Sequence, residues 1–383
     1  MQAANIESKL PGFGTTIFTV MTQLANQHKA INLSQGFPDF DGPQLLRDRV
    51  SWHMNQGHNQ YSPLPGMPAL REAIAAKVAT LYGAHVDPES QIAVTPGATE
   101  ALACAIGVTI HAGDEAIIID PAYDTYDPVI RLNGGMPVHL SMTPDFRIPW
   151  DQIEAAIRPQ TRLLILNSPH NPSGSAWQEE DIVSLRRVLA GRNIHVLADE
   201  VYEHILFDGQ EHLGLLRYPD LAARSFVVSS FGKTYHATGW RVGYCIAPAP
   251  LMEEFLRIHQ FVNFSTNTPM QLGIADFLRD CPEHHEELGA FYQPKRDLFN
   301  HLLGDTRFTF TPSAGTYFQL ADYSAISDMP DTEFARWLTV EHGVAAVPVS
   351  VFYANPPAQQ KVRFCFAKDD DTLREAASRL ARI

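Results

Sequence analysis

Short apolar runs alternate with helical patterns up to about residue 268, and this alternation restricts the possible folds more than any other feature. It is typical of a largely parallel sheet whose strands are joined by helices. Helices are predicted over 99–111 and 179–190, among others. The predicted strands are 92–95, 116–120, 163–167, 195–198, 226–229 and 242–247.

The pattern changes after about residue 268. A long helical stretch over 282–303 precedes a strand over 315–321, a helix over 331–342, a strand over 362–366 and a final helix. This order indicates a smaller α+β domain, which the N-terminal residues are expected to join. We therefore predict an α/β fold with a large domain over residues 45–280 and a small domain made of 1–44 together with 281–383.

The composition narrows the classes of partner. The chain has 43 acidic and 29 basic residues and a formal charge of −14, so it lacks the basic surface that nucleic-acid binding needs. No apolar stretch approaches the roughly 18 residues that span a bilayer, and the N-terminus lacks the pattern of a signal peptide. We expect no nucleic-acid partner, no membrane contact and a location in the cytoplasm.

Several common catalytic signatures are absent from the sequence. It contains no GxGxxG after a strand, no GxxxxGK[ST], no HExxH and no GxSxG. The four cysteines are far apart, and the neighbouring His284 and His285 would point in different directions on a helix. We therefore expect free thiols and no metal site.

Polar segments at the ends of predicted strands carry the candidate chemistry. In SSFGKTYHATGWRVGY, Lys233 follows a buried strand, and a lysine held near an apolar core has a lowered pKa and can act as a nucleophile. Ser230 and Arg241 lie close in sequence and are suited to holding a phosphate. The alternative for an isolated lysine in such a turn is a solvated loop residue.

Three further segments also carry polar residues at the end of a predicted strand. Each of them also has a purely structural interpretation. In LADEVYEH, Asp199 closes an apolar strand with Tyr202 three residues on, and its carboxylate either pairs with a cation or caps a helix. In HNPSG, Asn171 lies in a tight turn. In VTPGATEAL, a helix begins with N–H groups that can bind an anion or simply be capped; its first residues are Gly97, Ala98 and Thr99.

These groups together suit one ligand. Pyridoxal 5′-phosphate has a phosphate, a ring nitrogen that needs a carboxylate, a phenolic oxygen and an aldehyde that reacts with an amine. The four segments supply a partner for each of these groups. Over nearly its whole length the sequence resembles the class I and II aminotransferases of the fold-type I pyridoxal-phosphate superfamily. The resemblance runs from INLSQGFPDF at Ile31 through NQYSPLPGMPALREAI to VRFCFA at Val362. SQGFPDFDGP, SSFGKTYHATGWRVGYC and PVSVF resemble the branch of methionine aminotransferases and kynurenine/glutamine–phenylpyruvate transaminases.

The resemblance implies a large domain with a mostly parallel, seven-stranded type of sheet, beside a smaller α+β domain. It implies that Lys233 binds the aldehyde of the cofactor and, once released, moves a proton on the substrate. Asp199 would keep the pyridine nitrogen protonated, and Tyr202 and Asn171 would bond the phenolic oxygen. Tyr123 in DPAYDTY would stack on the ring.

The resemblance also implies how the phosphate and the substrate are held. Tyr61 would reach the phosphate of the neighbouring subunit, so a homodimer is expected. Arg363 would hold the α-carboxylate of the substrate, helped by Asn171 and the backbone at Gly36. The expected phosphate-binding residues of the same subunit are Gly97, Ala98, Thr99, Ser230 and Arg241.

Two positions depart from the family's usual pattern. Ala98 stands where relatives often carry a hydroxyl or a lysine, so backbone amides would bind more of the phosphate. Val349 in PVSVF stands where many relatives have glycine, which would reshape the edge of the pocket.

The resemblance implies an aminotransferase that moves the amino group of an amino acid to a 2-oxo acid by a ping-pong mechanism. Methionine is the expected donor, with aromatic amino acids, glutamine or kynurenine also possible, because no second cation for a dicarboxylate is evident. The alternatives are a cysteine-S-conjugate β-lyase, a kynurenine-preferring transaminase or a pyridoxal-dependent transcription regulator, which would need an added DNA-binding domain. Candidate apolar pocket residues are Ile17, Phe18, Phe37 and Phe264.

Overall fold

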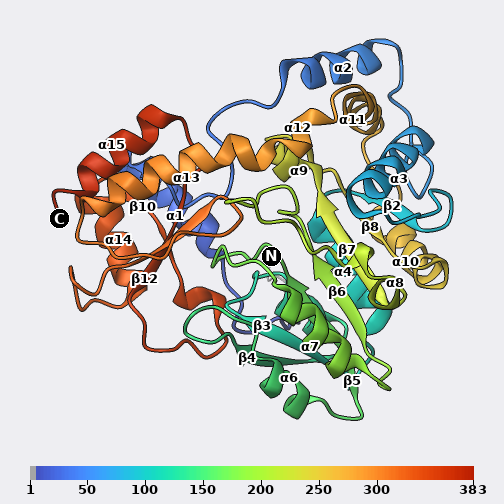
Figure 1. Ribbon diagram of the computed structural model, residues 1–383, viewed down its shortest axis with the longest axis horizontal. Coiled ribbons are helices and arrows are strands. Elements are labelled where there is room, and N and C mark those ends of the chain that lie inside the picture. Colours follow the sequence, from blue (N-terminus) through green and yellow to red (C-terminus); the bar gives the residue numbers. More distant parts are fainter. Residues whose placement is uncertain (1–5) are drawn as a thin grey trace, which may run out of the picture.

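A seven-stranded sheet forms the centre of the structure, a computed structural model that describes residues 6–383 (Figure 1). Its strand order is β2-β8-β7-β6-β5-β3-β4. Neighbouring strands from β7 to β4 are parallel, whereas β8 runs antiparallel to both β7 and β2. The predicted mostly parallel sheet is therefore confirmed. The strands are β2 Ile92–Thr95, β3 Glu115–Asp120, β4 Met136–Ser141, β5 Thr161–Asn167, β6 His195–Asp199, β7 Ser225–Ser230 and β8 Gly243–Ile246.

Helices cover both faces of this sheet because its strands are apolar on both sides. In β6, Val196 and Ala198 belong to one core cluster, and Leu197 belongs to the cluster on the opposite face. The first cluster is completed by α2 Gln44–Asn55, α3 Pro68–Tyr82, α6 Trp150–Ala156, α7 Glu179–Leu189, α8 Pro219–Ala222 and α11 Thr268–Asp280. The second is completed by α4 Ala98–Thr109, α5 Tyr126–Leu132 and α10 Ala249–Val262.

A third core cluster lies under two smaller sheets. β1 Ile31–Asn32 pairs in parallel with β10 Val344–Ala345, and β11, β12 and β9 form an antiparallel sheet. Among the described residues, no helix is both long and apolar enough to cross a membrane. The remaining elements here are β9 Phe318–Asp322, β11 Val347–Pro348, β12 Lys361–Cys365, α1 Ile17–His28, α12 Glu283–Glu286, α13 Leu288–Gly304, α14 Asp331–Glu341 and α15 Asp370–Leu380.

Three local predictions differ from the structure. Strand β4 was not predicted, because it is a half-exposed edge strand without an apolar run. The long helix expected over 282–303 is divided into α12 and α13 at Glu287, whose φ and ψ are −94° and 3°. The strand expected from residue 315 begins at Phe318, because Thr316 has a φ of 64°, outside the extended region.

The division into a large domain, 45–280, and a small domain, 1–44 with 281–383, stays a prediction. Its first five residues lie outside the described part of the chain. Tyr202, Ile205 and Phe207, which follow the central strand β6, belong to the third core cluster together with residues of α13, α14 and α15. The end of β6 is therefore where the central sheet meets the smaller sheets.

Candidate active site

A pocket opens at the carboxyl ends of β5, β6 and β7, the edge where ligands bind in parallel sheets. Asn167 and Asp199 are register partners at the ends of β5 and β6. Ser230 ends β7, and the short helix α9 Phe231–Thr234 follows it directly and carries Lys233. The pocket is lined by Ala98, Thr99, Leu102, Tyr123, Asn167, Asn171, Asp199, Val201, Tyr202, Ser230, Lys233 and Arg241.

Three residues that line the pocket were not predicted from the sequence. Asn167 ends the apolar run LLILN, so the rule that located Asp199 could also have located it. Leu102 lies one helical turn after Ala98, and Val201 lies within the turn after Asp199, so neither has a chemical signature of its own. The predicted residues that do not line the pocket are Gly36, Tyr61, Gly97 and Arg363.

Lys233 is half-buried, and its amine points at the segment around Gly36. Its Nζ donates a hydrogen bond of 3.2 Å to the carbonyl of Gly36, which also accepts a 2.6 Å bond from the hydroxyl of Tyr317. Burial lowers the pKa of Lys233 to about 8, and the positive charges of Arg363 and Arg241 act in the same direction. A substantial fraction of this amine is therefore neutral near pH 8, as a nucleophile or base requires.

Asp199 is a buried carboxylate without an ion-pair partner among residues 6–383. Its Oδ2 accepts a 2.6 Å bond from the hydroxyl of Tyr126, and its Oδ1 accepts a 3.3 Å bond from the amide of Val201. Burial raises its pKa to about 6, although both hydrogen bonds oppose the shift. Such a carboxylate suits a protonated ring nitrogen, which would supply the missing positive charge.

The start of α4 lines the side of the pocket where the sequence predicts phosphate binding. Gly97 has a φ of 81°, a backbone conformation that favours glycine, and Nη2 of Arg241 lies close to it, 2.6 Å from where a Cβ would be. The amides of the first helical turn, at Ala98 and Thr99, have no partner within the helix. Arg241 Nη2 lies 3.5 Å from Thr99 Oγ1. Amides, a guanidinium and a hydroxyl thus converge in the way that phosphate binding needs.

Arg363 on β12 forms the opposite side of the site and is fully buried. It donates from Nη1 to Oδ1 of Asn171 at 2.7 Å and from Nη2 to the carbonyl of Ser34 at 3.0 Å. Its Nε is buried and lacks a hydrogen-bond partner among the residues described. Burial lowers its pKa to about 10, so it remains charged at neutral pH. This guanidinium is therefore suited to a carboxylate from outside the chain.

The predicted tyrosines have very different surroundings. Tyr202 is buried against Tyr317, with ring centroids 5.2 Å apart. Tyr123 lines the pocket and packs edge-on against Tyr126. Tyr61 is 81% exposed and contacts Phe264 on the surface, so it does not reach the pocket of its own chain.

None of the four candidate apolar pocket residues lines the pocket. Ile17 packs against the third core cluster, whereas Phe18 lies beside the guanidinium of Arg363. Its ring centroid lies 5.3 Å from Cζ of Arg363. Phe264 instead lies beside Tyr61 on the surface, and Phe37 is half-exposed under Lys368. The donors and acceptors described above fit pyridoxal 5′-phosphate and a substrate carboxylate.

Comparison with known proteins agrees with this geometry. Residues 28–380 match the family described as aminotransferase class I and II. Methionine aminotransferase of Escherichia coli (strain K12) is 53% identical over 378 residues, which cover 98% of each chain. Kynurenine–oxoglutarate transaminase of Dictyostelium discoideum is 33% identical over 97% of this chain and 94% of its own. A crystal structure from Escherichia coli, reported with a methionine aminotransferase function, matches with a TM-score of 0.97 and 52% identity over 100% of both chains. The chain therefore belongs to the class I and II aminotransferases, fold-type I enzymes that depend on pyridoxal 5′-phosphate and act on amino acids and 2-oxo acids.

Proposed function

We propose that this aminotransferase takes the amino group of methionine, or of another amino acid with an uncharged side chain, and passes it to a 2-oxo acid by a ping-pong mechanism. The surroundings of Arg363 are the observation that carries the proposal. The rings of Phe18, Phe318 and Phe352 lie 5.3, 3.8 and 5.5 Å from its Cζ. The pocket-lining cations in the described chain are Lys233 and Arg241, both assigned to the cofactor, so this lining offers no further cation to a second substrate carboxylate.

The identity of 53% to a methionine aminotransferase over nearly the whole chain supports the same donor. We expect the reaction to take place in the cytoplasm, which fractionation of the source cells would test.

The protein's own groups divide the work of this reaction. When bound, pyridoxal 5′-phosphate supplies the carbon that takes up the amino group and a ring that accepts the electron pair left on the substrate Cα. Lys233 would remove the Cα proton as a base and then, as an acid, donate it to the carbon that takes up the amino group, because its pKa near 8 allows both roles. Asp199, ionised above about pH 6, would keep the pyridine nitrogen of the cofactor protonated. Arg363 and Asn171 hold the substrate carboxylate away from water.

The test is the visible spectrum of the cofactor-loaded protein during titration with L-methionine, without any 2-oxo acid. We expect the yellow band to disappear as a band at shorter wavelength grows. A yellow band that persists with methionine but disappears with kynurenine would favour the second candidate, a kynurenine-preferring transaminase, which the relative from Dictyostelium discoideum supports. Release of pyruvate and ammonia from a cysteine conjugate would favour the β-lyase. A protein that binds no cofactor would contradict the proposal.

We further propose a homodimer in which Tyr61 of each protomer reaches the phosphate site of its partner. Tyr61 is 81% exposed beside Phe264, and Phe261 nearby in sequence is 84% exposed. Exposed aromatic side chains of this kind favour an interface. Sedimentation tests the dimer, and mixing the variants Lys233→Ala and Tyr61→Ala tests the shared site. Subunit exchange should raise activity above that of either variant, since one hybrid site regains both residues.

A further inference from the structure

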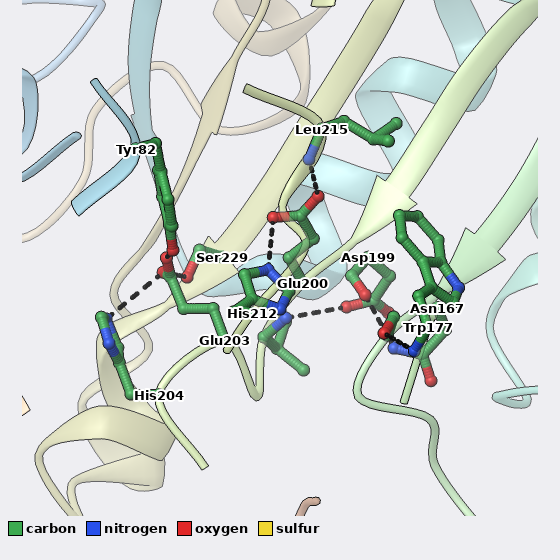
Figure 2. A network of polar contacts seen from close by, with 12 residues as sticks. Tyr82, Asn167, Trp177, Asp199, Glu200, Glu203, His204, His212, Leu215 and Ser229 are labelled. Atoms are coloured by element: carbon green, nitrogen blue, oxygen red, sulfur yellow. Dashed lines mark hydrogen bonds and ion pairs between the residues drawn. The ribbon is translucent and has the colours of Figure 1, made fainter. Parts of the chain in front are cut away.

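The turn that follows β6 presents side chains in two directions. Asp199 and Tyr202 line the pocket, whereas Glu200 and Glu203 are buried in polar contacts behind it. Figure 2 shows the three carboxylates with separate sets of partners. We infer that Glu203, paired with Lys77, is a positioning residue that fixes Tyr202 and the end of β7, an inference that rests on the function proposed above.

Glu203 is hydrogen-bonded at both of its carboxylate oxygens. Oε1 accepts bonds from Nζ of Lys77 at 2.8 Å, from the hydroxyl of Tyr244 at 2.9 Å and from the hydroxyl of Ser229. Oε2 accepts a bond from the hydroxyl of Tyr82. Burial acts to raise the pKa of Glu203, but Lys77 and the other donors outweigh it and hold the pKa well below its ordinary value. The carboxylate therefore stays ionised.

Lys77 is matched to the same set of groups. Its ammonium has three protons, and they are directed at Oε1 of Glu203, at the hydroxyl of Tyr244 at 2.7 Å and at Nε2 of His204 at 3.1 Å. Burial holds the pKa of His204 well below its ordinary value, so this ring is neutral and accepts the bond. A buried network in which every charge and donor is paired is rigid and selects one arrangement.

The partners of Glu203 come from three different elements, and two of these elements lead into the pocket. Ser229 precedes Ser230 on β7, four residues before Lys233. Tyr244 is the register partner of Ser229 on β8, which begins two residues after Arg241. Glu203 thus joins the turn that carries Tyr202 to the strand that leads directly to Lys233.

Glu200 attaches the other end of this turn. Its Oε1 accepts a 2.9 Å bond from the amide of Leu215, and its Oε2 pairs with Nε2 of His212 at 2.8 Å (Figure 2). Its own amide donates to the carbonyl of Val228 on β7 at 2.8 Å. Because Glu200 is fixed in this way, Glu203 controls the position of the half of the turn that contains Tyr202.

The first experiment replaces Glu203 by Gln, which keeps the size of the side chain and leaves the charge of Lys77 unpaired. We expect kcat to fall about 10-fold or more, with the KM for methionine changed by less than about 2-fold. We also expect the apoprotein to bind pyridoxal 5′-phosphate about 10-fold more weakly, because the displaced groups contact the cofactor. Calorimetry of the apoprotein gives this affinity without any turnover.

The matched control is Glu115→Gln. Glu115 is also a buried carboxylate with side-chain donors, namely Arg158, Gln160 and Thr161. It lies at the first residue of β3, the end of the strand away from the pocket. This variant should unfold at a lower urea concentration but keep the wild-type kcat and cofactor affinity.

A second pair of variants tests the same inference in case the Glu203→Gln protein does not fold. Ser229→Ala and Tyr82→Phe each remove one hydroxyl donor to Glu203 and leave the pair with Lys77 intact. Only Ser229 lies on a strand that enters the pocket. Ser229→Ala should therefore reduce kcat and cofactor affinity more than Tyr82→Phe, even if both lose the same stability in urea.

The outcomes separate this inference from the proposed function. Equal effects of Ser229→Ala and Tyr82→Phe, or a Glu203→Gln protein with wild-type kcat and cofactor affinity, would overturn the positioning role while Lys233→Ala remains inactive. An active Lys233→Ala protein would instead overturn the proposed function itself. Loss of activity in Glu115→Gln equal to that in Glu203→Gln would show a general effect of stability and would also overturn the positioning role.

Discussion

Two buried ionic regions lie on opposite sides of the turn after β6. Their charges are paired to different extents by other groups of the chain. In the network behind the turn, the charges of Glu203 and Lys77 are paired within the chain, and the pKa of Glu203 lies well below its ordinary value. In the pocket, burial raises the pKa of Asp199 to about 6 and lowers that of Lys233 to about 8. Asp199 and Glu203 are both buried and lie four residues apart, so burial alone does not explain the difference.

The difference lies in the partners that the chain supplies. Glu203 accepts four side-chain donors, whereas Asp199 accepts one hydroxyl and one backbone amide. A desolvated charge that the chain leaves incompletely paired is stabilised when a ligand supplies the missing partner. The comparison therefore predicts that variants in the pocket reduce catalysis strongly. Variants of charges that are paired within the chain should instead change the stability of the fold or the position of pocket residues.

Lys233→Ala should have the largest effect. It removes the only pocket-lining amine in the described chain, and with it the group proposed for cofactor attachment and for proton transfer at the substrate Cα. We expect turnover with methionine to fall by at least about 10⁴-fold. A coupled assay of the oxo-acid product measures this loss, with circular dichroism to check the fold. Substantial remaining activity would contradict the assignment of Lys233.

Asp199→Asn should have the next largest effect. The amide keeps an acceptor for the hydroxyl of Tyr126 but lacks the negative charge that we propose holds a proton on the pyridine nitrogen. We expect kcat to fall about 10²- to 10³-fold, with little loss of stability. Because burial raises the pKa of Asp199 in the free protein, removing its charge should not destabilise the fold at neutral pH. A variant that unfolds at a much lower urea concentration would instead place Asp199 among the structural charges.

Arg363→Lys tests the substrate side of the pocket. Lysine keeps the charge but cannot form two parallel hydrogen bonds to a carboxylate. We expect kcat/KM for methionine to fall about 10- to 100-fold, mainly through KM. The matched control is Arg296→Lys, because Arg296 is also buried, lies over the ring of Phe207 and pairs with Asp208 within the chain. A similar rise in KM in both variants would contradict a direct contact between Arg363 and the substrate.

Much of the central sheet and the pocket could be predicted from the sequence, for a physical reason. Buried parallel strands are apolar along their whole length, so a polar residue at the end of an apolar run marks the pocket edge, as at Asp199. Strand β4 escaped prediction because an edge strand needs no apolar run. The role expected of Arg363 came from family resemblance alone, since nothing in VRFCFA indicates that its guanidinium would be buried beside Asn171.

The network behind the pocket could not be predicted. Lys77 lies on α3, 126 positions before Glu203, and its helix has no pattern that marks one lysine as buried. The same holds for Tyr82 and Tyr244, which read as ordinary core aromatics until the fold brings their hydroxyls to one carboxylate. Sequence order locates groups on consecutive strand ends, whereas pairing between distant elements depends on the packed structure.

Replacing His139 should have the smallest effect. The pH dependence of stability at this residue tests whether charges that are paired within the chain stabilise the fold. Its Nδ1 lies 2.8 Å from Oδ1 of Asp120, and its Nε2 lies 2.8 Å from Oδ2 of Asp127. Burial acts to lower the pKa of His139, but the two carboxylates outweigh it and raise the pKa to about 9.

The protonated histidine should therefore stabilise the fold fully below about pH 6.5, the pKa in the unfolded chain, and lose this contribution as the pH rises through 9. We expect a loss of up to about 3 kcal/mol in the free energy of unfolding across that range. His139→Asn should lack this pH dependence and keep the wild-type kcat at pH 7, measured by urea denaturation and steady-state assay. If the free energy of unfolding depends on pH in the same way in both proteins, the pairing of His139 adds no stability. If His139→Asn lowers kcat, a charge that is fully paired within the chain also contributes to catalysis.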